Sequence, residues 1–208
     1  MKACCSAKPY RYLIMNEVYL QSLLVATLGL ACFACFTWGT IRHFVWQENG
    51  SAGAWVISLL SWVGLGVFIW QLFSWPLSEV WIGTCLLFTL SIGLWVWAVT
   101  GTRVTPPTLA FTNDDPHFLL SAGPYRWVRH PFYSAYMLFW TGTALATQGL
   151  LGWAVVSTMG LIYWAAARQE EGKFARSPLA SRYRDYAATT GGFFPRLWPR
   201  SQDSSSVL

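Results

Sequence analysis

The sequence predicts an all-α integral membrane protein with about five transmembrane helices, the last two forming a tight helical hairpin, followed by a cytoplasmic C-terminal helical tail. Of its 208 residues, 54% are hydrophobic and 11% are charged, whereas a soluble domain carries roughly 25% charged residues. The uncharged residues fall in long runs, and about 20 apolar residues suffice for a helix to cross the hydrocarbon core. These observations together indicate a helical membrane bundle.

Charged residues mark the ends of the first three predicted spans. Residues 18–41, 49–78 and 80–102 contain no Asp, Glu, Lys or Arg, so each run is predicted to hold one spanning helix. The second run is long enough to tilt or to overhang the bilayer. Residues 1–102 are therefore predicted to form an N-terminal three-helix membrane region.

The fourth uncharged run, residues 131–167, is too long for one crossing and suits two. Gln148-Gly149 supplies a turn, which predicts helices over 131–148 and 151–167. Four spans with a re-entrant pair remain the alternative, because so short a turn leaves open whether both helices cross the full bilayer.

The chain after this run is predicted to be a tail outside the membrane. Leu179, Tyr183 and Tyr186 share one face of a short helix at i, i+4, i+7 spacing. Residues 103–200 thus form a second region made of loop, hairpin and tail, and residues 201–208 are expected to be disordered.

The distribution of basic residues predicts which side of the membrane holds the tail. With five spans, only Lys2, Lys8 and Arg11 lie on the side opposite the C-terminus, so the positive-inside rule places the tail in the cytoplasm. The net charge of +5 then favours membrane lipids as partners and not nucleic acid. A bacterial inner membrane, or the endoplasmic reticulum of a eukaryote, is the expected location.

A polar cluster lies directly before the fourth run, in Ser121-Ala-Gly-Pro-Tyr-Arg-Trp-Val-Arg-His-Pro-Phe-Tyr133. Pro131 suits the first turn of a helix, where its missing N–H costs nothing. Arg129 and His130 are therefore predicted at a helix N-terminus, whose partial positive charge favours a carboxylate or phosphate. The alternative is a belt of basic and aromatic residues that only anchors the helix among lipid headgroups.

A second polar cluster, Arg168-Gln-Glu-Glu171, lies where the fourth run ends. One interpretation is purely structural: neighbouring cationic side chains neutralise its carboxylates. The functional interpretation is a carboxylate that recognises hydroxyls, an amine or a cofactor that bears a sulfonium. Because a hairpin returns the chain to its starting side, Glu170 is expected near His130.

Other motifs carry less chemistry. Cys32 and Cys35 lie inside an apolar run and are expected to pack as small hydrophobes. Gly64 and Gly66 follow no predicted strand, so helix packing explains them better than nucleotide binding. No metal-binding or nucleophile motif is present in the sequence, which leaves group transfer from a cofactor as a natural class of reaction.

Together the two clusters resemble the isoprenylcysteine carboxyl methyltransferase family and the related phospholipid methyltransferases. The resemblance lies in Gly123-Pro-Tyr125-x-x-Val-Arg129-His-Pro-x-Tyr133, then Glu170-Glu171, then Tyr183-x-x-Tyr186. It covers about residues 117–196, whereas the first three spans match only in being hydrophobic. It implies an S-adenosyl-L-methionine-dependent methyltransferase that acts on a lipophilic acceptor, such as a prenylcysteine-like carboxylate.

The resemblance also implies roles for particular residues. Arg129, His130 and Tyr133 are the implied catalytic residues, and no metal is implied. The implied cofactor contacts are His117, Phe118, Leu119, Leu120, Tyr125, His130, Pro131, Phe132, Tyr133, Glu170 and Glu171.

One position departs from the family pattern. The isoprenylcysteine enzymes have an arginine four residues before the first glutamate, where it binds the substrate carboxylate, and this chain has Ala166 there. Arg168 is the nearest arginine and is the predicted substrate-binding residue, provided that the helix end is rotated or unwound.

Two other functions remain open at this point. Sterol reductases have a similar Arg-His-Pro-x-Tyr helix start and use NADPH, so a membrane reductase is one alternative. An inactive membrane-anchoring module is the other. Titration with NADPH and with S-adenosylmethionine separates all three.

Overall fold

A computed structural model describes residues 7–44, 52–75, 77–104, 106–107, 111 and 116–196, with side chains from residue 16 onward. All the regular elements of the described residues are helices, and one isolated β-bridge joins Val128 to Gly191. In chain order the helices are α1 (Ala7–Arg42), α2 (Ala52–Ser74), α3 (Trp81–Gly101), the 3₁₀ helix η1 (Gly123–Arg126), α4 (Pro131–Thr147), α5 (Leu150–Arg176) and α6 (Ala180–Thr189).

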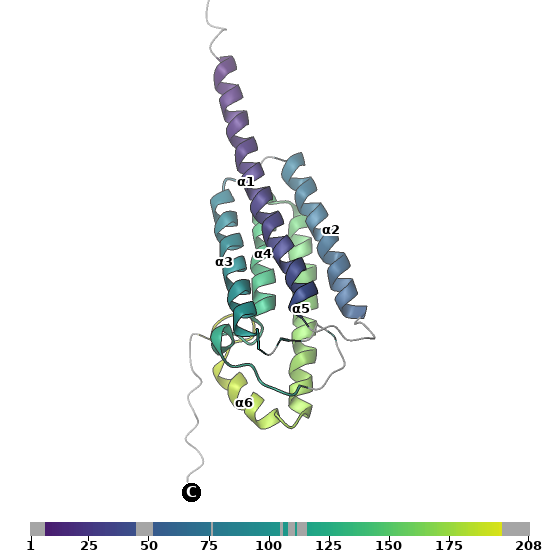
Figure 1. Ribbon diagram of the computed structural model, residues 1–208. Coiled ribbons are helices and arrows are strands. Elements are labelled where there is room, and N and C mark those ends of the chain that lie inside the picture. The colour runs from purple at the N-terminus through teal and green to yellow at the C-terminus, as the bar shows by residue number, and fades with distance from the viewer. Residues whose placement is uncertain are drawn as a thin grey trace, which may run out of the picture.

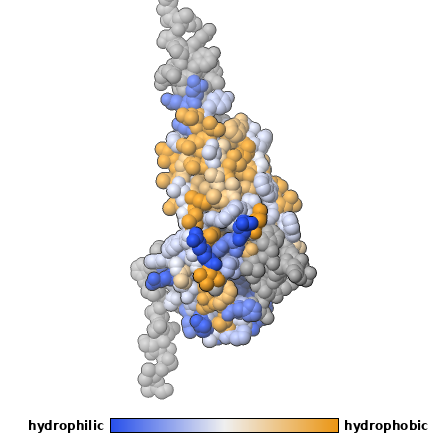
Figure 2. Space-filling view, in the orientation of Figure 1, coloured by the Kyte–Doolittle hydropathy of each residue, from blue (hydrophilic) through white to orange (hydrophobic). Residues whose placement is uncertain are grey.

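Among the described residues, four helices are long and apolar enough to cross a membrane: Asn16–Arg42, Ala52–Ser74, Trp81–Gly101 and Leu150–Arg176. The predicted all-helical membrane fold is confirmed, but the count of five spans is not. The missing span is α4, whose 17 residues rise about 26 Å at 1.5 Å per residue. Figure 2 shows apolar side chains covering the long helices, with polar ones gathered around the end that holds α6.

The helices α4 and α5 lie side by side and antiparallel, joined by Gln148 and Gly149 (Figure 1). A Cβ on Gly152 would lie 3.1 Å from the Cα of Ala144, so the two backbones approach closely beside this connection. Gln148 ends α4 in a left-handed conformation with φ 49°. We call this the turn end of the pair and the opposite one the α6 end.

The bounds of α5 differ from the predicted 151–167. The helix continues to Arg176, because the end of an uncharged run marks the edge of the hydrocarbon and not the end of a helix. Glu170 and Glu171 therefore lie within a continuous helix. In contrast, the predicted start at Pro131 is confirmed, with His130 as the N-cap residue.

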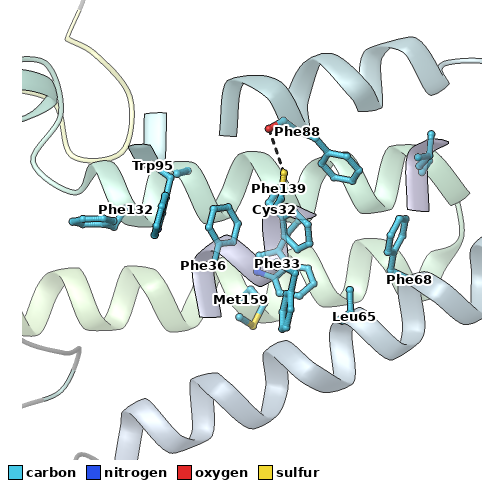
Figure 3. Packing of buried hydrophobic residues seen from close by; sticks show 14 of the residues in the cluster. Cys32, Phe33, Phe36, Leu65, Phe68, Phe88, Trp95, Phe132, Phe139 and Met159 are labelled. Atoms are coloured by element: carbon cyan, nitrogen blue, oxygen red, sulfur yellow. Dashed lines mark hydrogen bonds between the residues drawn. The ribbon is translucent and has the colours of Figure 1, made fainter. Parts of the chain in front are cut away.

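Aromatic side chains fill the centre of the bundle (Figure 3). Phe36 meets Phe139 edge-on with ring centroids 5.6 Å apart, and Phe88 stacks on Phe139 at 5.4 Å. The thiol of Cys32 donates to the Phe88 carbonyl at 3.6 Å, in agreement with its predicted packing role. Such ring pairs contribute about 0.5–1.5 kcal/mol each beyond area burial, and they join α1, α3 and α4.

A small cap, made of η1, α6 and residues 190–193, covers the α6 end. The backbone N–H of Arg129 donates to the Gly191 carbonyl at 2.8 Å, and that of His130 donates to Gly192 at 3.2 Å. The Ser134 hydroxyl donates to the Phe193 carbonyl at 2.7 Å. These bonds hold the cap against the first turn of α4. The predicted disordered segment, residues 201–208, lies outside the described residues.

Candidate functional site

A cavity of about 550 Å³ lies at the α6 end and continues between α1 and α2. Its charged and titratable wall comes from residues 117–130, α4, α5 and α6, whereas α1 and α2 contribute only uncharged side chains. The two predicted polar clusters meet in this wall because the start of α4 lies beside the last third of α5.

Glu171 is held between two basic side chains. Its Oε1 accepts a hydrogen bond from Arg129 Nε at 2.9 Å and lies 3.2 Å from His130 Nε2. Arg129 also donates from Nη1 to the carbonyls of Ala187 at 3.3 Å and Thr190 at 2.6 Å. Arg129 thereby fastens the last turn of α6 to α5. Glu171 is thus committed to protein partners.

Glu170 is arranged differently. The Tyr133 hydroxyl donates to its Oε1 at 2.5 Å, and its Oε2 lies 3.5 Å from His130 Nδ1. Its side chain is 36% exposed, against 21% for Glu171. A carboxylate accepts about four hydrogen bonds, so Glu170 keeps capacity for a ligand in the cavity.

His130 lies between the two carboxylates. Burial alone would lower the pKa of His130, but hydrogen bonds to Glu170 and Glu171 outweigh burial and raise it above the ordinary 6.5. Both ring nitrogens face carboxylate oxygens, and only the imidazolium has a proton on each nitrogen. The geometry therefore favours a cationic His130 that orients both glutamates.

The predicted cofactor contacts converge on one wall. His117 to Leu120, Tyr125 and Pro131 to Tyr133 all line the cavity, as do the two glutamates. His117 and Phe118 are exposed, so this loop forms the outer rim. Tyr125 in η1 is fixed by α6, because its carbonyl accepts a hydrogen bond from the Tyr186 hydroxyl at 2.7 Å.

Arg168 is the predicted residue that the structure does not bring to the others. It is exposed, and its guanidinium lies 5.9 Å from the ring centroid of Trp164. It does not line the cavity, whereas Ala166 is fully buried. Residues two apart on a helix point in nearly opposite directions, so a regular α5 turns Arg168 away from the face of Ala166.

Two lining residues and one residue packed against His130 were missed by sequence reasoning. Lys173 and Phe174 follow Glu170 at i+3 and i+4 and line the cavity with it, a helical spacing that could have revealed them. Phe193 lies 5.7 Å from the His130 ring. No sequence signal marks that contact, because the backbone turn after α6 creates it.

The class of protein follows from these features: an integral membrane bundle whose cavity has paired carboxylates at one end and an uncharged interior. The family model for phospholipid methyltransferases matches residues 78–181, half of the chain. The chain therefore belongs to the phospholipid methyltransferase family. This confirms the predicted resemblance to these enzymes and to the related isoprenylcysteine enzymes.

Three relatives show how far the similarity extends. A methanethiol S-methyltransferase of Pseudomonas deceptionensis is 27% identical over 93% of this chain and 66% of its own length. The cobalt-zinc-cadmium resistance protein CzcN of Cupriavidus metallidurans is 33% identical over 38% of this chain and 36% of its own. An uncharacterized Schizosaccharomyces pombe protein is 33% identical over 42% and 28%, respectively. The chain thus covers less than two thirds of each relative.

Proposed function

We propose that this protein is an S-adenosyl-L-methionine-dependent methyltransferase that acts on a lipophilic acceptor within the membrane. The observation that carries the proposal is Glu170, a partly exposed carboxylate that His130 and Tyr133 hold at the boundary between the polar and apolar halves of the cavity. Family membership supplies the reaction class.

The residues fit this cofactor chemically. S-adenosylmethionine supplies a methyl group activated by a sulfonium, and its amino group adds a second positive charge. A carboxylate with unused acceptor capacity suits these cations, and the aromatic ring of Phe132, which lines the cavity, suits a sulfonium by cation–π attraction. Glu170 is the group proposed to bind the cation.

The other polar residues are proposed to position Glu170 and to hold α6 over the cavity. Arg129 and Glu171 hold α6 over the cavity, and His130 orients both glutamates. The apolar walls exclude water, so the reacting groups meet in line in a dry site. Holding reactants in this way contributes several kcal/mol, up to ~7–11 in the best cases. No covalent catalysis by the protein is needed.

The acceptor is proposed to enter from the bilayer, because the cavity extends between α1 and α2 along the membrane-spanning part of the bundle. A prenylcysteine-like carboxylate is one candidate, but Arg168, its predicted ligand, lies outside the cavity. A small thiol is the second, favoured by the methanethiol S-methyltransferase that aligns with 93% of this chain. The site is proposed to face the cytoplasm, where the cofactor is available.

Titration of the purified protein in lipid nanodiscs with S-adenosylmethionine and with NADPH tests the proposal. The wild type should bind S-adenosylmethionine, and Glu170→Gln should weaken binding by roughly a hundredfold, since an unpaired charge in a binding site costs about 2–5 kcal/mol. The matched control is Glu79→Gln, an exposed carboxylate between α2 and α3. Binding of NADPH without S-adenosylmethionine would support the membrane reductase. Binding of neither compound would support the inactive anchoring module.

A further inference from the structure

A second cavity, of about 460 Å³, lies between the ends of α1 and α3. It lies on the opposite face of α1 from the candidate site: Thr40 and Phe44 line the first cavity, whereas Trp38 and Arg42 line the second. Arg42 at the end of α1 and Arg103 after α3 are the charged side chains among its described lining residues. The second cavity is therefore separate from the glutamates and has a basic lining.

Both arginines lie at the border of the hydrocarbon core. The apolar span of α1 ends at Arg42, and that of α3 ends at Gly101, two residues before Arg103. On the face drawn in Figure 2, the apolar surface ends in strongly hydrophilic side chains. The two guanidinium groups are thus at the depth where the phosphates of membrane lipids lie.

A buried hydrogen bond fastens the two helix ends to each other. His43 Nε2 lies 2.7 Å from the hydroxyl of the fully buried Thr102, which gives its own proton to the Ala98 carbonyl at 2.8 Å. Nε2 is therefore the donor of the bond between His43 and Thr102. Because each arginine is adjacent to one of these two residues, the bond also keeps the backbones of the two arginines close together.

The positive charge of this pair is not neutralised by a described side chain. Both arginines are exposed, and every salt bridge among the described residues involves Arg129 or His130 instead. The partial negative charge of a helix C-terminus, about half an elementary charge, offsets each guanidinium only in part. Two arginines held together in this way suit a phosphate, which accepts paired hydrogen bonds from a guanidinium.

The wall on the membrane side of the arginines is apolar. It includes Trp38, one helical turn before Arg42, and Val96 and Val99 of α3. The side chains of Trp38 and Val96 are 57% and 47% exposed, so a hydrocarbon chain can lie against them. Tryptophan is common at this depth, where an apolar ring meets the headgroups. A charged end followed by an apolar wall matches a phospholipid better than a soluble anion.

We propose that this second cavity binds an anionic phospholipid, with its phosphate between Arg42 and Arg103 and one acyl chain along the apolar wall. Basic residues at the membrane surface attract lipids of net negative charge. A zwitterionic lipid has the same phosphate but adds a cation, which the arginines repel. The bound lipid is a partner that joins α1 to α3 and not a methyl acceptor, because α1 separates it from Glu170.

Two lipids with the same acyl chains test the proposal. The full chain in detergent is titrated with dioleoyl phosphatidylglycerol and with dioleoyl phosphatidylcholine, and native mass spectrometry measures the affinity for the first bound lipid. Phosphatidylglycerol should bind about tenfold more tightly, because of its net charge. Glycerol 1-phosphate, its soluble headgroup, should bind far more weakly, because it makes no contact with the apolar wall.

The double variant Arg42→Gln/Arg103→Gln should weaken binding of phosphatidylglycerol by about thirtyfold, since each arginine near an anionic lipid contributes about fivefold in affinity. Binding of phosphatidylcholine should change far less. The matched control is Arg182→Gln/Arg184→Gln, which removes the same charge from exposed positions on α6 and should leave both affinities unchanged. Each single variant, Arg42→Gln or Arg103→Gln, should weaken binding of phosphatidylglycerol by about fivefold, which keeps the test valid if the double variant does not fold.

Three results would overturn the inference. Equal affinities for the two lipids would remove the requirement for negative charge. Equal losses in the α6 double variant would show that the basic surface as a whole attracts the lipid. Glycerol 1-phosphate bound as tightly as phosphatidylglycerol would assign the arginines to a free phosphate. All three results would leave the proposed function standing, since none involves S-adenosylmethionine or the acceptor.

Discussion

The two ends of the α4–α5 pair are built from opposite kinds of residue. At the turn end, Ala144 and Gly152 let the backbones approach closely. At the α6 end, the stacked rings of Tyr133 and Tyr163 lie between the helices, and charged groups follow. The side chains between α4 and α5 are thus small at the turn end and large beside the cavity. Small residues favour close helix packing in membranes, so the turn end supports stability and the α6 end can hold a ligand.

The largest expected effect on stability is at the turn end. Gly152→Leu should lower the free energy of unfolding by about 3 kcal/mol, because the new side chain meets the α4 backbone and overpacked sites cost about 1–3 kcal/mol. Thermal unfolding in detergent measures the loss. Gly93→Leu is the matched control, since a Cβ there meets nothing within 4 Å. Equal losses in both variants would contradict the close approach.

A smaller effect is expected at the α6 end. Glu171→Gln should lower the free energy of unfolding by about 1–2 kcal/mol, because Arg129 and His130 lose a charged acceptor in a partly buried site. Hydrogen exchange should also quicken in α6, which Arg129 fastens to α5. If α6 exchanged at the wild-type rate, Arg129 would not depend on Glu171 for its position.

The smallest effect is that of pH on wild-type stability. The pKa of His130 is higher in the folded protein than its ordinary value, so the imidazolium stabilises the fold fully below the unfolded pKa. This contribution is lost as pH rises through the folded pKa. The unfolding midpoint of the wild type should fall between roughly pH 6 and roughly pH 9. This fall should be smaller than the fall that Glu171→Gln causes at constant pH. The pH dependence should flatten in His130→Gln.

The sequence was most informative where a rule of helix chemistry applies. Pro131 predicted the start of α4, and the return of the chain through Gln148-Gly149 predicted that Glu170 meets His130. Uncharged runs found the apolar helices but not their ends: α1 begins at Ala7 and α5 ends at Arg176. A helix continues through charged residues once it leaves the hydrocarbon, so charge alone cannot mark its last turn.

Two features of the site were beyond the sequence for a physical reason. The carbonyls of Gly191, Gly192 and Phe193 hold the cap, and backbone acceptors leave no trace in residue identity. The different surroundings of Glu170 and Glu171 depend on which one faces Arg129, and adjacent residues of the same type differ only in direction around the helix axis. The outward placement of Arg168 followed from helix geometry and was predictable.

The backbone bonds between residues 127–130 and Gly191 or Gly192 close a ring of chain that contains α4, α5 and α6. During translation the ribosome releases α4 and α5 well before Gly191, and domains form as their segments emerge. The ring, and with it the fastening of Arg129, is completed only when the last residues of the cap have been synthesised. A ribosome stalled before that point would present an inserted helix pair without a finished site, because the carbonyls that hold the cap follow α6 in the chain.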